Sequence, residues 1–494
     1  MALVLPGCSR VSLGELGGLR QPSERAPADQ PADGEAAEPL DRPSPRAPGT
    51  VFPSDVYGRT TLPEDGISGR YGGRTYEGAA PAKPRPARAA LLVPLSGPHG
   101  ELGQALLNAA QMALFDVADR RFILIPYDTA GTPEGARQAA LSALDDGATI
   151  ILGPLFSTSV AAVARTIRGL EVPVLAFSSD RLVAEPGIYP LGLFPGEQIR
   201  RAVSYAREQG HERFAVFAPD TPLGRAVVEA LSETLTRKGG VLVQVELFPD
   251  STADVTPQVK QLADYEARQK ALEEARGELA DTLAAAEALA AGERQKADRL
   301  AAARGLDLAS LTEDDLARIE AELKKLKEQD TLGDVNFDAL VLPLANDRVL
   351  QIAPLLSYYD IDPNKVKFIG TSQWDTPNLG NEPALVGGWF AAPDPDDRAR
   401  FETDYAQLFG APPPRLATLA YDATALAAFL GRGTDGPDFS RTQLQSAKGF
   451  AGLDGVFRLK ANGLSERRLA VLEVRPKGIR TVSPAPQRFE DLSN

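Results

Sequence analysis

From residue 89 onward the chain repeats one pattern, in which a short unbroken apolar run precedes a segment with apolar residues at helical spacing. Such runs are typical of parallel strands buried on both faces, and the amphipathic segments supply the helices that cover them. The first series comprises AALLVPL, RFILIPYD, ATIILGP and VPVLAF, and the second comprises RFAVFAPD, VLVQVELF, FDALVLPL and VKFIGTS. The sequence therefore predicts an α/β fold with two doubly wound, Rossmann-like lobes.

The segments between these runs are expected to be helices. They cover residues 104–117, 133–144, 157–167, 196–209, 222–237, 347–358, 397–409 and 415–430. Near the end, Asn462 and Gly463 form a dipeptide that favours a tight hairpin turn between short extended segments. The last residues, 483–494, are polar and contain prolines, so we expect a frayed tail.

The stretch between the sixth and seventh runs is too long for an ordinary crossover helix. Leu272, Leu279 and Leu283 repeat at spacings of seven and four, which is a coiled-coil pattern. Gly305 marks a turn, and Thr312 with Asp315 forms a capping-box signature. We expect an antiparallel helical hairpin over 262–330, inserted in the second lobe. Two interpretations remain open: the hairpin binds a partner or a second copy, or it satisfies its apolar surface by itself.

The N-terminal region has a different composition. The sequence LPGC at residues 5–8 resembles a lipobox, which predicts that residues 1–8 are a signal remnant and that Cys8 carries a lipid. The leader is short, so this hypothesis places the translation start upstream; the alternative is a free Cys8 without a role. Residues 9–87 are rich in Pro, Gly, Ala and charge and predict a disordered tether.

Composition excludes several classes of function. The net charge of −14 argues against a nucleic-acid partner, and no apolar run reaches the length of a membrane span. Two histidines and one cysteine are too few for a His/Cys metal site, so we expect no metal and no cofactor. The chain has neither a GxSxG elbow nor a P-loop lysine, and we therefore expect a protein that is not an enzyme.

Polar residues follow the predicted strands, at the edge where doubly wound sheets bind ligands. The candidate contacts of a ligand cleft are Ser96, Ser157, Thr158, Ala176, Ser178, Asp220, Asn346, Thr371 and Ser372. Ser157 and Thr158 begin a helix, whose free N–H groups favour a carboxylate or similar anion. Alternatively, the Ser157 hydroxyl only caps that helix.

The segment VPLSGPHGELGQAL, residues 93–106, contains three glycines but no phosphate-binding lysine and no GxGxxG spacing. We interpret Gly97, Gly100 and Gly103 as points of close backbone approach, where the first strand turns into the first helix. The loop then forms the floor of a cleft, with Ser96 as a possible ligand contact.

The order of these segments resembles the Leu/Ile/Val-binding type of periplasmic binding proteins. The resemblance rests on LLVPLSGPHGELGQALLNAAQMAL, YDTAGTPEGARQAALSAL, GATIILGPLFSTSVAAVA, VPVLAFSSD, LATLAYDATALAAFL and GLDGVFRLKANG. It implies a ligand cleft between two lobes joined by crossovers. The first lobe is then formed by residues 88–193 and 376–447, and the second by residues 194–375 and 448–482.

Two departures from this family argue against a free amino acid as ligand. Amino-acid binders place an aromatic residue where this chain has Leu223, and an acidic group where it reads GTSQWD, with Thr371 and Ser372 in the nearer places. The resemblance still allows a substrate-binding protein of an ABC importer, with amino acids or related small solutes as ligands.

A narrower resemblance, to the penicillin-binding protein activator lipoproteins, rests on FIGTSQWDTPNLGNEPALVGGWFAAPDP and PPRLATLAYDATAL. It implies a regulator of peptidoglycan synthesis in the periplasm, anchored to the outer membrane, with a penicillin-binding protein as partner. We adopt this function as the leading hypothesis and the importer protein as the alternative. Trp374 and Trp389 lie in this segment and are either interface anchors or core residues.

Overall fold

The computed structural model describes residues 86–489, apart from 118–120, 252–253, 306–310, 377 and 434–435. The predicted signal remnant, the lipidation of Cys8 and all but the last two residues of the predicted tether lie outside this part of the chain. These three expectations therefore stay predictions. Ala87, the last residue of the predicted tether, already begins the first strand.

The first lobe is built on a five-stranded parallel sheet in the order β2-β1-β3-β4-β5. One face packs against α2 and the late helices α12 and α13, and the other face packs against α3 and α4. The strands are β1 (Ala87–Val93), β2 (Phe122–Asp128), β3 (Ile150–Leu152), β4 (Val174–Ala176) and β5 (Ile188–Pro190). The helices are α2 (Gly100–Val117), α3 (Pro133–Asp145), α4 (Ser157–Thr166), α12 (Pro395–Phe409) and α13 (Ala417–Leu430).

The second lobe contains a seven-stranded mixed sheet in the order β14-β13-β10-β9-β8-β6-β7. Its strands are β6 (Arg213–Pro219), β7 (Val241–Phe248), β8 (Ala339–Val341), β9 (Lys367–Gly370), β10 (Trp389–Ala392), β13 (Ala470–Val474) and β14 (Ile479–Ser483). β13 runs antiparallel to both of its neighbours, and the other pairs are parallel. The helices that cover the two faces are α5 (Pro195–Glu208), α6 (Pro222–Lys238), α7 (Thr256–Leu262) and α11 (Asn346–Tyr358). Both lobes have the predicted doubly wound α/β architecture.

Two predicted lobe boundaries are wrong. We expected residues 448–482 in the second lobe, but Phe450, Phe457 and Leu459 belong to the core of the first lobe. We also expected residues 376–447 in the first lobe, but β10 pairs with β9 and β13 in the sheet of the second lobe. Backbone pairing and the burial of Phe390 and Ala392 in the second lobe's core hold this strand there. The chain returns to the first lobe only with α12, whose Phe401 and Tyr405 belong to the first lobe's core.

The chain passes between the lobes three times: between β5 and α5, between β10 and α12, and in the segment that follows α13. We call these segments the crossovers. The third crossover contains the predicted hairpin, in which β11 (Phe457–Leu459) pairs antiparallel with β12 (Ser465–Arg467). Gly463 has a φ of +87° at the hairpin turn, which confirms the turn predicted from Asn462 and Gly463.

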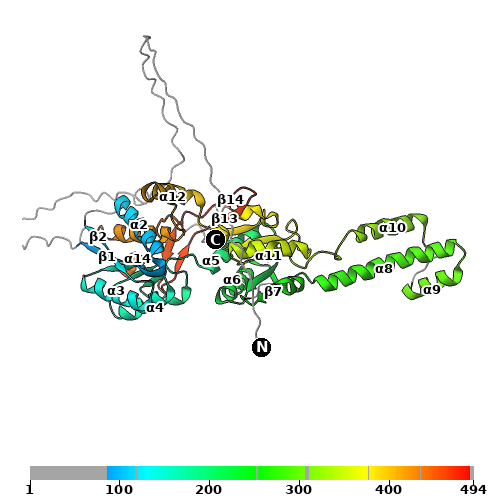
Figure 1. Cartoon of the computed structure of the whole chain (residues 1–494), viewed down its shortest axis with the longest axis horizontal. Coiled ribbons are helices and arrows are strands. Elements are labelled where there is room, and N and C mark those ends of the chain that lie inside the picture. The colour runs from blue at the N-terminus through cyan, green and yellow to red at the C-terminus, as the bar shows by residue number, and fades with distance from the viewer. Residues whose placement is uncertain are drawn as a thin grey trace, which may run out of the picture. The chain divides into compact units, whose positions relative to one another are not determined.

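The described part of the insertion in the second lobe contains three helices, where two were predicted (Figure 1). They are α8 (Tyr265–Ala290), α9 (Arg294–Arg304) and α10 (Glu313–Lys327). The chain turns at Gly292, where φ is +80°, and both α9 and α10 pack against α8. Gly305 ends α9 in a left-handed conformation, and Thr312 and Asp315 form the predicted capping box.

The C-terminal residues do not fray as predicted, at least as far as residue 489. Phe489 is 5% exposed, and the guanidinium groups of Arg458 and Arg468 lie 4.4 and 4.3 Å from its ring centroid. Arg201 donates to the hydroxyl of Ser483 at 2.6 Å. Cation–π contacts and burial therefore fix a segment whose polar composition had suggested mobility.

The close approach predicted for the glycines of the first loop is confirmed at Gly103 and Gly100 but not at Gly97, where an added Cβ would lie 3.5 Å from the nearest atom, the carbonyl oxygen of Ala130. A Cβ on Gly103 would lie 1.8 Å from the carbonyl oxygen of Pro94, and Gly97 has a φ of +77°. A Cβ on Gly100 would lie 3.3 Å from the carbonyl oxygen of Leu95, a less severe approach. Short elements elsewhere are η1 (Gly97–His99), η2 (Arg181–Val183), η4 (Ser372–Trp374), η5 (Leu379–Asn381), η6 (Pro383–Leu385) and α14 (Arg441–Leu444).

Candidate functional site

The predicted cleft residues lie at the carboxyl edges of the two sheets. In the first lobe, Ser96 follows β1, Ser157 and Thr158 begin the helix after β3, and Ala176 and Ser178 lie at the end of β4. Because β1, β3 and β4 are neighbours in the sheet, these three loops share one edge.

The second lobe repeats this arrangement. Asp220 follows β6, Asn346 begins the helix after β8, and Thr371 and Ser372 follow β9. β6, β8 and β9 are adjacent, so these loops also share an edge. The side chain of Asn346 lies outside the described part of the chain, and its role as a ligand contact stays a prediction.

Several of the predicted ligand-binding atoms already have partners within the chain. The carbonyl of Ala176 accepts a hydrogen bond from the N–H of Leu191 at 2.8 Å. The hydroxyl of Ser178, which is 5% exposed, accepts from the N–H of Asp180 at 3.1 Å. These atoms stabilise the end of β4 and the first crossover, so a ligand has to share them or displace their partners.

The loop around Ser96 is organised by a carboxylate that the sequence analysis did not single out. Asp128, the last residue of β2, accepts from the N–H groups of Leu95, Ser96 and Ala130 at 2.8, 3.2 and 2.7 Å. Burial raises the pKa of Asp128, but the hydrogen bonds from Ser96, Ala130 and Leu95 outweigh it and hold the pKa below its ordinary value. The negative charge of Asp128 therefore fixes the backbone of this loop.

Polar groups at the carboxyl edge of the second lobe also have partners within the chain. Asp220 forms an ion pair with Arg225, and the N–H of Ser372 donates to the side-chain oxygen of Gln198 at 2.6 Å. Both contacts join the carboxyl edge to helices α5 and α6 of the same lobe.

The N-terminus of α4 keeps polar groups available. Phe156 occupies the N-cap position without a side-chain cap, so the Ser157 hydroxyl does not cap this helix.

Two hydroxyls among the described residues, those of Ser159 and Thr371, are buried without a hydrogen-bond partner, and these residues are only 1% and 4% exposed. Unpaired buried hydroxyls are costly and commonly mark a site for a water or ligand. Ser159 was missed because it lies inside a helix and does not directly follow a strand.

Buried ion pairs gather at the crossovers. Arg467 of β12 donates to Asp422 of α13 at 3.2 Å, and Arg415 lies 2.9 Å from Asp454. The guanidinium of Arg398 in α12 lies 2.6 Å from the carboxylate of Asp375, which follows β9 in the second lobe. We call these three pairs the crossover cluster; Asp375–Arg398 and Asp422–Arg467 are each 9% exposed or less.

Two carboxyl groups beside these pairs are perturbed. Burial raises the pKa of Glu197 to about 7, although Arg200 and the N–H of Arg467 oppose the shift. Burial also raises the pKa of Asp422, against the attraction of Arg467. Burial therefore disfavours the charged form of both carboxyl groups at the segments that join the lobes.

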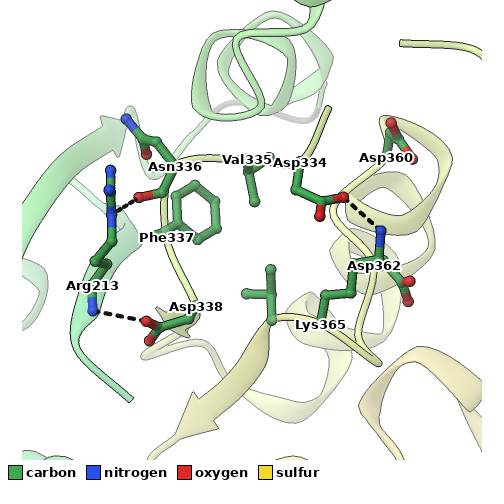
Figure 2. Close-up of a pocket in the computed structure, with 10 residues that line it drawn as sticks. Arg213, Asp334, Val335, Asn336, Phe337, Asp338, Asp360, Asp362 and Lys365 are labelled. Atoms are coloured by element: carbon green, nitrogen blue, oxygen red, sulfur yellow. Dashed lines mark hydrogen bonds and ion pairs between the residues drawn. The ribbon is translucent and has the colours of Figure 1, made fainter. Parts of the chain in front are cut away.

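A pocket of about 270 Å³ lies at the opposite edge of the second lobe's sheet (Figure 2). Its lining includes Arg213 at the start of β6, Asp338 just before β8 and Val366 just before β9. Asp338 accepts from the N–H of Arg213 at 3.1 Å, and Lys365 pairs with Asp334 at 2.6 Å. This pocket is formed at the amino ends of the strands and is not the predicted cleft.

The two tryptophans are core residues. Trp374 is fully buried, and Trp389 is 7% exposed and donates from Nε1 to Glu473 at 3.1 Å. Neither side chain is available as the interface anchor that we had considered.

No group of three or more His, Cys, Asp or Glu residues within the described ranges can hold a metal ion. None of the helices described is both long and apolar enough to cross a membrane.

Two curated proteins are similar to this chain over part of its length. Over 176 residues the chain is 23% identical to an uncharacterized protein of Rickettsia prowazekii (strain Madrid E), covering 35% of this chain and 47% of that protein. Over 172 residues it is 29% identical to the penicillin-binding protein activator LpoA of Vibrio cholerae serotype O1 (strain ATCC 39541 / Classical Ogawa 395 / O395), covering 34% of this chain and 28% of that protein. The chain spans less than half the length of these two relatives.

Solved structures match over a longer range. A putative branched-chain amino acid ABC transporter from Rhodospirillum rubrum matches with a TM-score of 0.59 at 17% identity, covering 80% of this chain and 100% of that one. A leucine-, isoleucine-, valine-, threonine- and alanine-binding protein from Brucella ovis matches with a TM-score of 0.52 at 16% identity, covering 82% and 95%. At such identities these matches show a common fold. The family model described as periplasmic binding protein matches residues 86–479, and the chain therefore belongs to the periplasmic binding protein family.

Proposed function

We propose that this protein is a non-enzymatic lipoprotein of the cell envelope that activates peptidoglycan synthesis by a penicillin-binding protein. In this proposal Cys8 carries the lipid that anchors the chain to the outer membrane, and residues 9–87 give it reach across the periplasm. The folded lobes then act as a binding partner and not as a carrier of solute.

The observation that carries the proposal is the 29% identity to the penicillin-binding protein activator LpoA. The geometry supports the same function, because atoms that would hold a small solute are engaged within the chain. The Ala176 carbonyl, the Ser178 hydroxyl and the Asp220 carboxylate all have internal partners.

The crossover cluster supports the proposal because it favours a constant angle between the two lobes. Solute-binding proteins close around their ligand by bending at the segments between their domains. Here Asp375 and Arg398 join the second lobe to a helix of the first, and Asp422 and Arg467 join that lobe to the third crossover. Separating a buried ion pair leaves unpaired charges, which opposes a change of lobe angle.

A second candidate function is that of a substrate-binding protein of an importer. It is favoured by the N-terminus of α4, whose hydroxyl residues Ser157 and Thr158 are available for an anionic group. The unpaired hydroxyls of Ser159 and Thr371 are further groups that a small polar solute can satisfy.

A pull-down with a tagged form without lipid, from detergent-solubilised envelopes of the source cell, separates these functions. The activator role predicts recovery of a penicillin-binding protein. Recovery of an importer permease without any peptidoglycan synthase would overturn it. A parallel thermal-shift screen over amino acids and peptidoglycan fragments tests the cleft, since a ligand that binds only the folded state raises the melting temperature. The activator role predicts no amino acid that raises it.

A further inference from the structure

A second concave surface lies where the helical insertion leaves the second lobe, far along the chain from the cleft residues of the first lobe. This pocket of about 550 Å³ forms at the end of α7 and the start of α8. We call it the root groove. It is lined by Asp254, Thr256, Pro257, Lys260, Gln261, Asp264, Tyr265 and Glu266.

The root groove is bordered by three tyrosines that we call the tyrosine cluster. The ring of Tyr359 lies edge to face against both Tyr265, at 5.1 Å between centroids, and Tyr358, at 5.0 Å. Tyr265 belongs to both the groove and the cluster. Tyr358 is 72% exposed, so a large aromatic surface lies open to solvent beside a concave site. Exposed aromatic side chains of this kind are frequent energetic centres of protein interfaces.

The charge of the groove indicates what binds there. Asp254, Asp264 and Glu266 contribute three carboxylates against the single ammonium of Lys260. Asp264 occupies the N-cap position of α8 without capping it. Neither its carboxylate nor that of Glu266 pairs with another described residue. Burial raises the pKa of the Tyr265 phenol, and the nearby Asp330 and Asp360 raise it further.

The tyrosine cluster already receives a cation within the chain. The ammonium nitrogen of Lys260 lies 5.6 Å from the ring centroid of Tyr359. The negative face of an aromatic ring attracts ammonium and guanidinium groups, and adjacent carboxylates strengthen that attraction. The exposed ring of Tyr358 offers the same kind of surface to a cation from outside.

The groove is rigidly supported. Arg268 in the first turns of α8 donates to the carbonyls of Ala263 and Gly333 and to the carboxylate of Asp360. These bonds join the start of the insertion to the segment before β8 and to the end of α11. A site held in place in this way loses little conformational entropy when a partner binds.

We propose that the root groove and the tyrosine cluster dock a Lys- or Arg-bearing segment of the penicillin-binding protein. This inference rests on the proposed function, for which it names the contact surface. The same charges disfavour a second copy of this chain and an anionic ligand as occupants of the groove. A symmetric contact between two copies brings carboxylates against carboxylates, and an anionic ligand meets like charge.

The test measures binding of the full chain to the purified penicillin-binding protein of the source cell. Two single variants, Tyr358→Ala and Glu266→Lys, are each expected to weaken binding about tenfold. Raising the salt concentration is expected to weaken binding of the unaltered chain, since exposed charge contacts are screened. Tyr358 and Glu266 are exposed, so both variants are expected to keep the melting temperature of the unaltered chain, and this measurement checks that their fold is intact.

Matched controls lie on the first lobe. Phe115→Ala removes an aromatic ring that is 84% exposed, and Glu171→Lys makes the same charge change on an exposed loop. Both are expected to bind within about twofold of the unaltered chain.

The outcomes separate the two proposals. If the unaltered chain does not bind the synthase, the proposed function fails, and the occupant of the groove fails with it. If the unaltered chain binds and both groove variants bind equally well, only the groove inference is overturned. Sedimentation that shows self-association lost in Tyr358→Ala would also overturn it, because the occupant is then a second copy.

Discussion

The guanidinium of Arg467 donates to Oδ2 of Asp422 at 3.2 Å, and the two side chains are 3% and 1% exposed. Asp422 lies in the middle of α13, whereas Arg467 belongs to the third crossover. Arg467 also donates to the carbonyls of Leu191 and Gly455, at 3.5 and 3.4 Å. One side chain therefore joins a helix of the first lobe to two of the three crossovers.

Removing one partner of this pair is expected to destabilise the fold. Asp422→Ala leaves the guanidinium of Arg467 buried without a counter-charge, which costs about 3–5 kcal/mol of unfolding free energy. Urea denaturation measures this loss. The control Asp334→Ala breaks the exposed pair with Lys365, for which a much smaller change is expected. Equal effects of the two substitutions would contradict the importance of the buried pair.

Stability is expected to depend on the protonation of Glu197. Burial raises its pKa in the folded state to about 7, above the value of 4.5 that applies when it is unfolded. Between these values the folded state binds more protons, so the contribution of Glu197 to stability falls as pH rises from about 4.5 to 7 and is constant above. Glu197→Gln removes this dependence. We therefore expect the stability difference between Glu197→Gln and the unaltered chain to shift in favour of the variant from pH 5 to pH 8. Urea denaturation of both proteins at pH 5 and pH 8 measures this stability difference. A difference that is the same at both pH values would contradict the role of Glu197.

The insertion is expected to become more mobile when the hydrogen bonds of Arg276 are lost. Arg276 of α8 donates to the carbonyls of Leu326 and Gln329, all at 3.0 Å or less, and so holds the end of α10. Arg276→Met keeps much of the apolar stem but removes the hydrogen bonds from the guanidinium to these two carbonyls. Hydrogen exchange is expected to accelerate in α10 and to stay unchanged in β1 and β8. Lys270→Met, which breaks an exposed pair with Glu274, is the matched control and is expected to leave α10 protected.

The sequence predicted the layered fold because apolar runs report burial locally. It missed β5 and β10, although it predicted β3, β4 and β8, which are just as short. β10 is fixed by pairing with β13, about 80 residues away in the sequence. The strand-end residues of the candidate site could be predicted because they follow parallel strands, whose carboxyl ends share one edge of a sheet. The hydrogen bond from Leu191 to the Ala176 carbonyl continues the pairing of β4 with β5, a strand that the sequence did not predict, and no local pattern reports it. The crossover cluster was missed for the same reason, since Asp422 and Arg467 are 45 residues apart.

The first loop provides a test of the glycine interpretation. A Cβ on Gly103 would lie 1.8 Å from the Pro94 carbonyl oxygen, so Gly103→Ala forces β1 and α2 apart and lowers the melting temperature. Gly100→Ala, where the corresponding distance is 3.3 Å, is expected to lower it less. Thermal unfolding of both variants compares them, and an equal or reversed order would contradict the interpretation.

The proposed function makes this member of the periplasmic binding protein family an activator of a peptidoglycan synthase. The most direct measurement is the rate of glycan polymerisation by the purified penicillin-binding protein of the source cell, with and without the full chain. If the proposed function is right, the rate rises with the concentration of the chain, saturates, and does not change when free amino acids are added. A rate that stays constant at saturating concentrations of the chain would contradict it.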